Sequence, residues 1–348
     1  MFIETLSFLN VRKTTEAHYN FIPQTNLIVG KNGVGKTTII EALFLLSTTK
    51  SFRKKQNKAI IKEGKNTLQA KGVFFEKENQ KTIKISIKNN KKIITENQKT
   101  IKRTSQLLNK TPMVCMSPEE TDVIESYKGE KMKYFDKIIF RINQKHIKEI
   151  KEYKTLLHYR NTLLEQKKET SPWDKKIAET GINIWATREK FFKEIITTFN
   201  KVQKKTKTTK YSIEYFAPQI INQKKYIKKL QEKTNQEKTN TGPHQDTTIF
   251  KINNKNLQEN GSQGEKKLFK CLLKLAEVET LKTNQEKTPI FLLDDFFAKL
   301  DDENIMKIFI YFHCKFQTII TTTETKKNTI KNILGVKNEE KIKIIKCQ

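Results

Sequence analysis

The sequence predicts an α/β protein, a head with a mixed sheet and an antiparallel β lobe, interrupted by an inserted helical arm. Three observations predict it. A glycine-rich loop at residues 30–37 lies between an apolar run, residues 27–29, and a helical stripe at residues 38–46. Residues 67–103 alternate between apolar and polar side chains, as half-buried strands do. Residues 143–205 repeat apolar side chains every three or four positions, which is typical of long amphipathic helices.

The glycine-rich loop has the pattern Gly-x-x-x-x-Gly-Lys-Thr of phosphate-binding loops in nucleotide hydrolases. Glycine lets the backbone approach a phosphate closely, and the N-terminus of the following helix adds partial positive charge. Lys36 is expected to reach the β- and γ-phosphates, and the Thr37 hydroxyl to ligate Mg²⁺. The chain has no Asn-Lys-x-Asp motif, which disfavours GTP and leaves ATP as the expected nucleotide. The predicted cofactor-binding residues here are Gly30, Lys31, Asn32, Gly33, Val34, Gly35, Lys36, Thr37 and Thr38.

A second segment supplies the acids that such a loop requires. Residues 289–293 form an apolar run that ends in Asp294 and Asp295, as expected for a buried parallel strand of the Walker B type. Asp294 is expected to hold Mg²⁺ together with Thr37. Asp295 and Lys36 are the predicted catalytic residues, with Asp295 orienting or deprotonating the attacking water. Residues 316–323 predict a further buried strand.

A serine and a glycine lie in the segment Gly261–Lys267, which an apolar-faced helix with Leu268, Phe269 and Leu272 follows. Alone, Ser262 and Gly264 are better explained as a helix cap, although a helix N-terminus also binds anions. Beside the loop and the acid strand, they look like the signature of ABC-type ATPases, which closes on the γ-phosphate held by a partner subunit. Residues 298–301 match the accompanying D-loop, which adds Asp301 to the predicted cofactor-binding residues. The sequence therefore predicts a P-loop ABC-type ATPase head.

Positive charge is concentrated in two segments of a chain whose formal net charge is +30. Residues 50–110 hold 18 basic and 4 acidic residues, and residues 145–240 hold 23 basic and 11 acidic residues. This distribution predicts a polyanionic partner such as DNA. A bias toward lysine codons in an AT-rich genome is an alternative, since only six of the 68 basic residues are Arg. The predicted DNA contacts are Arg53, Lys54, Lys55 and Lys58.

The helical stretch divides the chain. Ser171-Pro172-Trp173-Asp174 separates two amphipathic runs and is a good helix start, with Ser as the cap. The runs are expected to form an arm, or alternatively an ordinary insertion packed on the core. The predicted head comprises residues 1–142 and 241–348, and the predicted arm comprises residues 143–240. The hexapeptide at residues 234–239 recurs at residues 283–288, and both copies are expected to be solvated loops.

Targeting and redox signals indicate a cytosolic protein. Glu4 interrupts the short apolar start, so no secretory signal is expected, and no apolar run reaches the ~18 residues of a membrane span. Four isolated cysteines favour reduced thiols over a metal site. They are Cys115, Cys271, Cys314 and Cys347.

Further motifs occur in a fixed order along almost the whole chain. They are Asn26–Gly33, Glu41–Ala42, Lys50–Arg53, Ser117–Glu119, Tyr153–Leu164 with Arg160 and Asn161, Trp173–Asp174 with Gly181 and Arg188, Gly242–His244, Ser262–Glu265, and Leu292–Asp295 with Leu300–Asp301. With these motifs the chain resembles the bacterial RecF family of DNA-repair ATPases, which are related to SMC proteins. It departs from the family where Gln245 replaces an arginine and where residues 131–133 carry lysines in place of arginines, because lysine is the poorer phosphate ligand.

The resemblance implies a weak, DNA-stimulated ATPase that binds ATP and Mg²⁺ and forms an ATP-dependent homodimer on DNA, which hydrolysis releases. It implies a role in recombinational repair and replication-fork maintenance, with gap repair, recombinase loading and support of the SOS response. Expected partners are single-stranded or gapped DNA and mediators of the RecR and RecO type, in the cytosol at the nucleoid.

Two other classes of protein share part of the motif set. In an ABC transporter ATPase subunit the signature lies closer to the loop and a histidine follows the acid strand. Here about 225 residues separate Thr37 from Ser262, and Thr321-Thr322 occupies the position of that histidine. A non-hydrolysing DNA scaffold that holds ATP is the second alternative. It is disfavoured because every expected catalytic residue type is present, and a phosphate-release assay separates it from an ATPase.

Overall fold

The fold is seen in a computed structural model of the 348-residue chain. The structure describes residues 1–53, 60–89, 91–102, 107, 110–118, 120, 122–208, 210–218, 222–232, 237–295, 300–313, 315–324 and 341–347. The chain forms two compact units. The first comprises Met1–Thr121, Lys205–Lys207 and Gln263–Gln348, and the second comprises Asp122–Lys204 and Thr208–Ser262. The division into a head and an arm at residues 143 and 240 stays a prediction.

The first unit contains a five-stranded parallel sheet whose strand order is β14-β3-β13-β12-β8. Its strands are β3 (Thr25–Val29), β8 (Met113–Met116), β12 (Ile290–Leu293), β13 (Thr318–Thr322) and β14 (Ile342–Lys346). Every residue of the four strands other than β14 is buried, as expected when both faces of a parallel sheet are covered. The buried strands predicted at residues 289–293 and 316–323 are confirmed as β12 and β13. Because the strands are parallel, the residues that follow β3, β8, β12 and β13 meet at one edge of the sheet.

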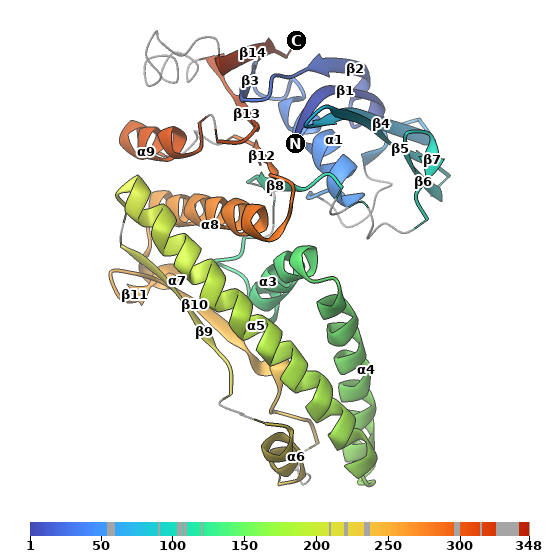
Figure 1. The fold of residues 1–348 in the computed structure, drawn as a ribbon, viewed down its shortest axis with the longest axis vertical. Coiled ribbons are helices and arrows are strands. Elements are labelled where there is room, and N and C mark those ends of the chain that lie inside the picture. The colour runs from blue at the N-terminus through green and yellow to red at the C-terminus, as the bar shows by residue number, and fades with distance from the viewer. Residues whose placement is uncertain are drawn as a thin grey trace. The chain divides into compact units, whose positions relative to one another are not determined.

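The second sheet of this unit is the predicted antiparallel lobe, with strand order β2-β1-β4-β5-β6-β7 (Figure 1). Its strands are β1 (Phe2–Val11), β2 (Thr14–Asn20), β4 (Thr67–Glu76), β5 (Asn79–Lys88), β6 (Lys91–Glu96) and β7 (Lys99–Thr100). Ile83, Ile85 and Ile87 are buried, as their alternation predicts. Asn89 has a φ of 48° at the predicted turn, a conformation that asparagine tolerates. The fold class is confirmed, with parallel and antiparallel strands in separate sheets.

Three helices complete the first unit in the part of the chain that is described. They are α1 (Lys36–Thr48), α8 (Gln263–Asn284) and α9 (Asp302–Phe312). Apolar residues of α1 join strands of both sheets in one core, which holds Ile40, Leu43 and Leu46 together with Ile85 and Leu292. This packing fixes α1, and with it the loop before α1, against the sheet edge. Residues 283 and 284 end α8, so the second hexapeptide copy starts in a helix and not in a solvated loop as predicted.

The second unit contains α3 (Lys128–Ile142) and the two predicted long helices, α4 (Lys145–Glu165) and all but the last two residues of α5 (Ser171–Thr206). The backbone N–H of Asp174 donates to the carbonyl of Thr170, so Thr170 caps α5, and the predicted cap at Ser171 is wrong by one residue. The shift has a physical reason, because the Asp174 carboxylate turns inward and accepts hydrogen bonds from Arg160 and from the Thr170 hydroxyl.

This unit also contains elements that the sequence analysis missed. They are the antiparallel sheet β11-β10-β9 and two short helices, with β9 at Tyr211–Phe216, β10 at Thr247–Ile252, β11 at Lys255–Asn256, α6 at Gln223–Gln231 and α7 at Leu257–Asn260. Thr239, at the end of the first hexapeptide copy, is buried and accepts a hydrogen bond from Arg160, which contradicts the predicted solvated loop. No helix among the described residues is long and apolar enough to cross a membrane.

Candidate nucleotide site

The glycine-rich loop connects β3 to α1 in a conformation that favours glycine at three positions, one of which is Gly33 with a φ of 82°. Gly35 has a φ of 106°, which side-chain-bearing residues rarely adopt. A Cβ atom on Gly30 would lie 2.7 Å from the carbonyl oxygen of Cys347, so only glycine fits beside the C-terminal strand. The Lys36 ammonium donates to the carbonyls of Gly30 and Lys31, at 2.6 and 2.8 Å. The loop therefore holds the Lys36 charge over its own backbone, where a phosphate would bind.

The acid strand meets this loop as the sequence analysis predicted. The Thr37 hydroxyl donates to Oδ1 of Asp294 over 3.0 Å, although 257 residues separate the two in the sequence. Asp294 also accepts hydrogen bonds from Thr321, at 2.8 Å, and from Ser117, at 3.1 Å. Four segments that are distant in the sequence therefore contribute to one cluster of oxygen atoms.

Burial raises the pKa of the Asp294 carboxyl above its usual range, and the hydroxyls of Thr321, Thr37 and Ser117 oppose that shift because they bind the ionised form. The next acid, Asp295, is exposed and has a φ of 49°. The two adjacent carboxylates therefore differ in environment: one is buried and hydrogen-bonded to hydroxyls, and the other is open to solvent.

The signature residues lie at the start of α8. Ser262 is exposed immediately before this helix, and Gly264 is half-buried in its first turn. Asp301 caps α9, since its carboxylate accepts hydrogen bonds from the backbone and side-chain nitrogens of Asn304, each at 2.7 Å. Residues 298 and 299 of the predicted D-loop lie outside the described residues. The roles of these residues toward a nucleotide stay predictions.

The predicted DNA contacts Lys54, Lys55 and Lys58 also lie outside the described residues. Arg53 is half-buried, and its charge lowers the pKa of Asp294, which is opposite in direction to the larger effect of burial. Arg53 therefore lies within electrostatic reach of the nucleotide site, while its contact with DNA stays a prediction.

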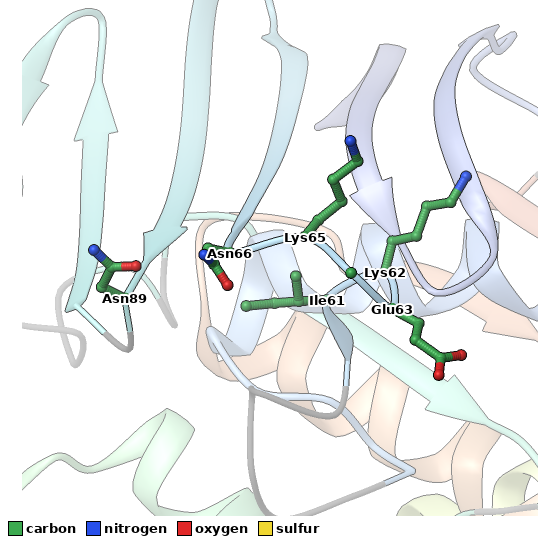
Figure 2. A pocket seen from close by; sticks show the side chains of 7 residues that line it. Ile61, Lys62, Glu63, Lys65, Asn66 and Asn89 are labelled. Atoms are coloured by element: carbon green, nitrogen blue, oxygen red, sulfur yellow. The ribbon is translucent and has the colours of Figure 1, made fainter.

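A solvent-open hollow of about 410 Å³ lies in the same basic region, between the start of β4 and the β5–β6 turn. Its lining residues are Ile61, Lys62, Glu63, Gly64, Lys65, Asn66 and Asn89. Figure 2 shows the side chains of Lys62 and Lys65 extending toward the top of the view and that of Glu63 toward the bottom.

Sequence reasoning did not assign roles to several residues beside the loop. Arg12 donates two hydrogen bonds to Glu41, at 2.8 and 2.6 Å, and the hydroxyl of Ser51 contacts the same carboxylate. Glu41 is fully buried in α1. An acidic residue within an apolar stripe of a helix was the sequence feature that could have indicated a buried ion pair. Ser117 was noted only as part of a motif, and its bond to Asp294 has no signature in the sequence.

A parallel sheet with a phosphate-binding loop after one strand and an acid after another, joined by the Thr37–Asp294 bond, defines a P-loop protein with an ABC-type ATPase fold. The SMC head domain from Pyrococcus furiosus has the same fold, with a TM-score of 0.55 over 93% of this chain and 90% of that chain at 17% identity. The family model for the RecF/RecN/SMC N terminal domain matches residues 2–344. The chain belongs to the RecF family within this group.

Two relatives show how close the similarity is. The DNA replication and repair protein RecF of Clostridium botulinum (strain Langeland) is 31% identical over 340 residues, which cover 93% of both chains. A structure described as the recombination mediator protein RecF-ATPrS in the RecFOR pathway superposes with a TM-score of 0.78 at 27% identity, over 93% of this chain and 92% of that one. The resemblance inferred from the motifs is thereby confirmed.

Proposed function

We propose that this protein is an ATP-dependent DNA-binding ATPase of recombinational repair and replication-fork maintenance. In this proposal ATP assembles two copies on single-stranded or gapped DNA, and weak, DNA-stimulated hydrolysis releases them at the nucleoid. The proposal includes recombinase loading and mediators of the RecR and RecO type, and the RecFOR pathway named for one similar structure supports such partners. The observation that carries the proposal is the hydrogen bond between Thr37 and Asp294, which brings the loop and the acid strand together.

The two oxygen atoms joined by this hydrogen bond are suitable ligands for a magnesium ion. Mg²⁺ prefers hydroxyl and carboxylate oxygens at 2.0–2.1 Å in an octahedron, so two adjacent ligands lie about 2.9 Å apart. The Thr37 and Asp294 oxygens are 3.0 Å apart. These two residues are the proposed magnesium ligands, and Lys36 and the loop amides are the proposed phosphate ligands. Bound magnesium would neutralise charge on the phosphate oxygens.

The proposal predicts a change of molar mass. ATP with Mg²⁺ should double the molar mass of the wild type in light scattering, because the exposed Ser262 of each copy can face the nucleotide of the other. Lys36→Ala should stay monomeric and bind ATP about 10- to 100-fold more weakly, since hydrogen bonds to charged groups contribute about 1.5–3 kcal/mol. Lys282→Ala, an exposed lysine late in α8, is the control and should dimerise. A wild type that remains monomeric with ATP would refute the dimer.

DNA binding can be tested in the described part of the basic region. Lys62 and Lys65 line the hollow, and the Lys62 ammonium donates to the hydroxyl of Thr15. Lys62→Glu/Lys65→Glu should weaken binding to gapped DNA, most at low salt. It should also reduce the slope of log K against log salt by about 1.5, because each lost phosphate contact contributes ~0.7–0.9.

A fluorescence anisotropy titration across salt concentrations measures both quantities. The matched control is Lys282→Glu/Lys346→Glu, two exposed lysines of the first unit outside the basic segments. An unchanged slope in the Lys62/Lys65 variant, or an equal loss in the control, would show that this rim does not contact DNA.

A further inference from the structure

The strand that carries the two acids lies between strands that each contribute a hydroxyl to it. β12 pairs with β13 on one side and with β8 on the other. From β13, Thr321 donates to Oδ1 of Asp294, and from the end of β8, Ser117 donates to Oδ2. Both hydroxyl-bearing residues are buried. The carboxylate of Asp294 is therefore held at both oxygens by groups from opposite sides.

Thr321 contacts the second acid as well. Its hydroxyl oxygen accepts a hydrogen bond from the backbone N–H of Asp295 over 2.9 Å, while its hydrogen points to Asp294. A hydroxyl has one donor and two acceptor positions, so one side chain can hold both acids. Asp295 adopts a left-handed backbone conformation, which aspartate tolerates better than most residues that carry a side chain. The Thr321 bond to its backbone N–H helps to hold this conformation.

We propose that Thr321 and Ser117 are positioning residues of the nucleotide site, which set the orientation of Asp294 and Asp295 without contacting the nucleotide. The inference rests on the proposed ATPase function. The terminal torsion of an aspartate is soft, so an unrestrained carboxylate rotates. With Oδ2 held by Ser117 and Oδ1 shared by Thr321 and Thr37, the Asp294 carboxylate presents one fixed oxygen toward the loop.

Thr321→Val removes the hydroxyl and keeps the shape, and Ser117→Ala removes the other one. The probe is Mn²⁺, a magnesium substitute, added to the protein with a non-hydrolysable ATP analogue, with free Mn²⁺ measured by electron paramagnetic resonance. Loss of such supporting bonds weakens metal affinity about 10- to 100-fold. The loss of Mn²⁺ affinity in Thr321→Val should fall in this range, and the loss in Ser117→Ala should lie at its lower end. Thr321→Ser should bind Mn²⁺ as the wild type does. Analogue binding in EDTA should be unchanged in all three variants, which separates a positioning role from a loss of the site.

Thr280→Val is the matched control, because Thr280 is a buried threonine of α8 whose hydroxyl has no hydrogen-bond partner among the described residues. It should bind Mn²⁺ as the wild type does. Wild-type Mn²⁺ affinity in folded Thr321→Val would overturn the inference and leave the proposed function intact. A folded Thr321→Ser variant that does not bind Mn²⁺ would also overturn the inference and leave the proposed function intact. A wild type that binds the analogue and no Mn²⁺ would overturn the inference and the proposed magnesium site together.

Discussion

Asp295→Asn should abolish ATP turnover while the variant still binds ATP. We expect phosphate release in the presence of DNA to fall about a hundredfold or more, since a positioned general base contributes about 10²–10⁴. The side chain of Asp295 is exposed at the edge where the loop and the acid strand meet, so it can approach a water molecule there. An amide has the same shape but cannot accept the proton. The left-handed backbone of this residue is compatible with asparagine, so the fold should be retained.

The same variant tests what hydrolysis does. If hydrolysis releases the dimer, Asp295→Asn with ATP should remain dimeric for longer than the wild type in light scattering. Glu286→Gln, an exposed acid of the same unit, is the control and should turn over ATP normally. Normal turnover in Asp295→Asn would remove this residue from the mechanism. A wild type without any turnover would favour the non-hydrolysing scaffold.

The nucleotide site could be predicted from sequence where its chemistry is local. The loop at residues 30–37 and the acids at residues 294 and 295 each follow a buried strand, as their short motifs predict, while their roles toward a nucleotide stay predictions. The support of the acids could not be predicted in this way. Ser117 lies 177 residues from Asp294, and only the order of strands in the sheet brings them together. Serine and threonine are too common for their presence to indicate such a bond.

In the second unit, prediction from sequence failed for a different reason. Tyr226 and Leu230 of α6 are buried four positions apart, yet they lie among lysines and glutamines, and two apolar positions are too few to predict a helix there. Strand β9 alternates buried and half-buried residues at Tyr211, Ser212 and Ile213, a pattern too short to stand out. Such short patterns form a helix or a strand only when another segment packs or pairs with them, as β10 pairs with β9.

Arg188→Met should produce the largest loss of stability in the chain. Arg188 interrupts the apolar stripe of α5 and is buried against two aspartates, with hydrogen bonds of 2.8 and 3.0 Å to Asp136 and 2.6 Å to Asp246. Burial by itself raises the pKa of Asp136, but the bond from His146 and the charge of Arg188 outweigh it and hold this pKa below its usual range. Methionine removes the guanidinium that both buried carboxylates share, at a cost of about 3–5 kcal/mol.

Unfolding of the second unit can be followed by tryptophan fluorescence, because both tryptophans of the chain, Trp173 and Trp185, lie in it. Lys190→Met, an exposed lysine on the same helix, is the control and should change the free energy of unfolding by less than about 0.5 kcal/mol. Adding Asp136→Asn and Asp246→Asn to Arg188→Met should recover part of the loss, since the uncompensated charges are then removed. If the triple variant is no more stable than Arg188→Met, the loss arises from packing of the arginine side chain and not from buried charge.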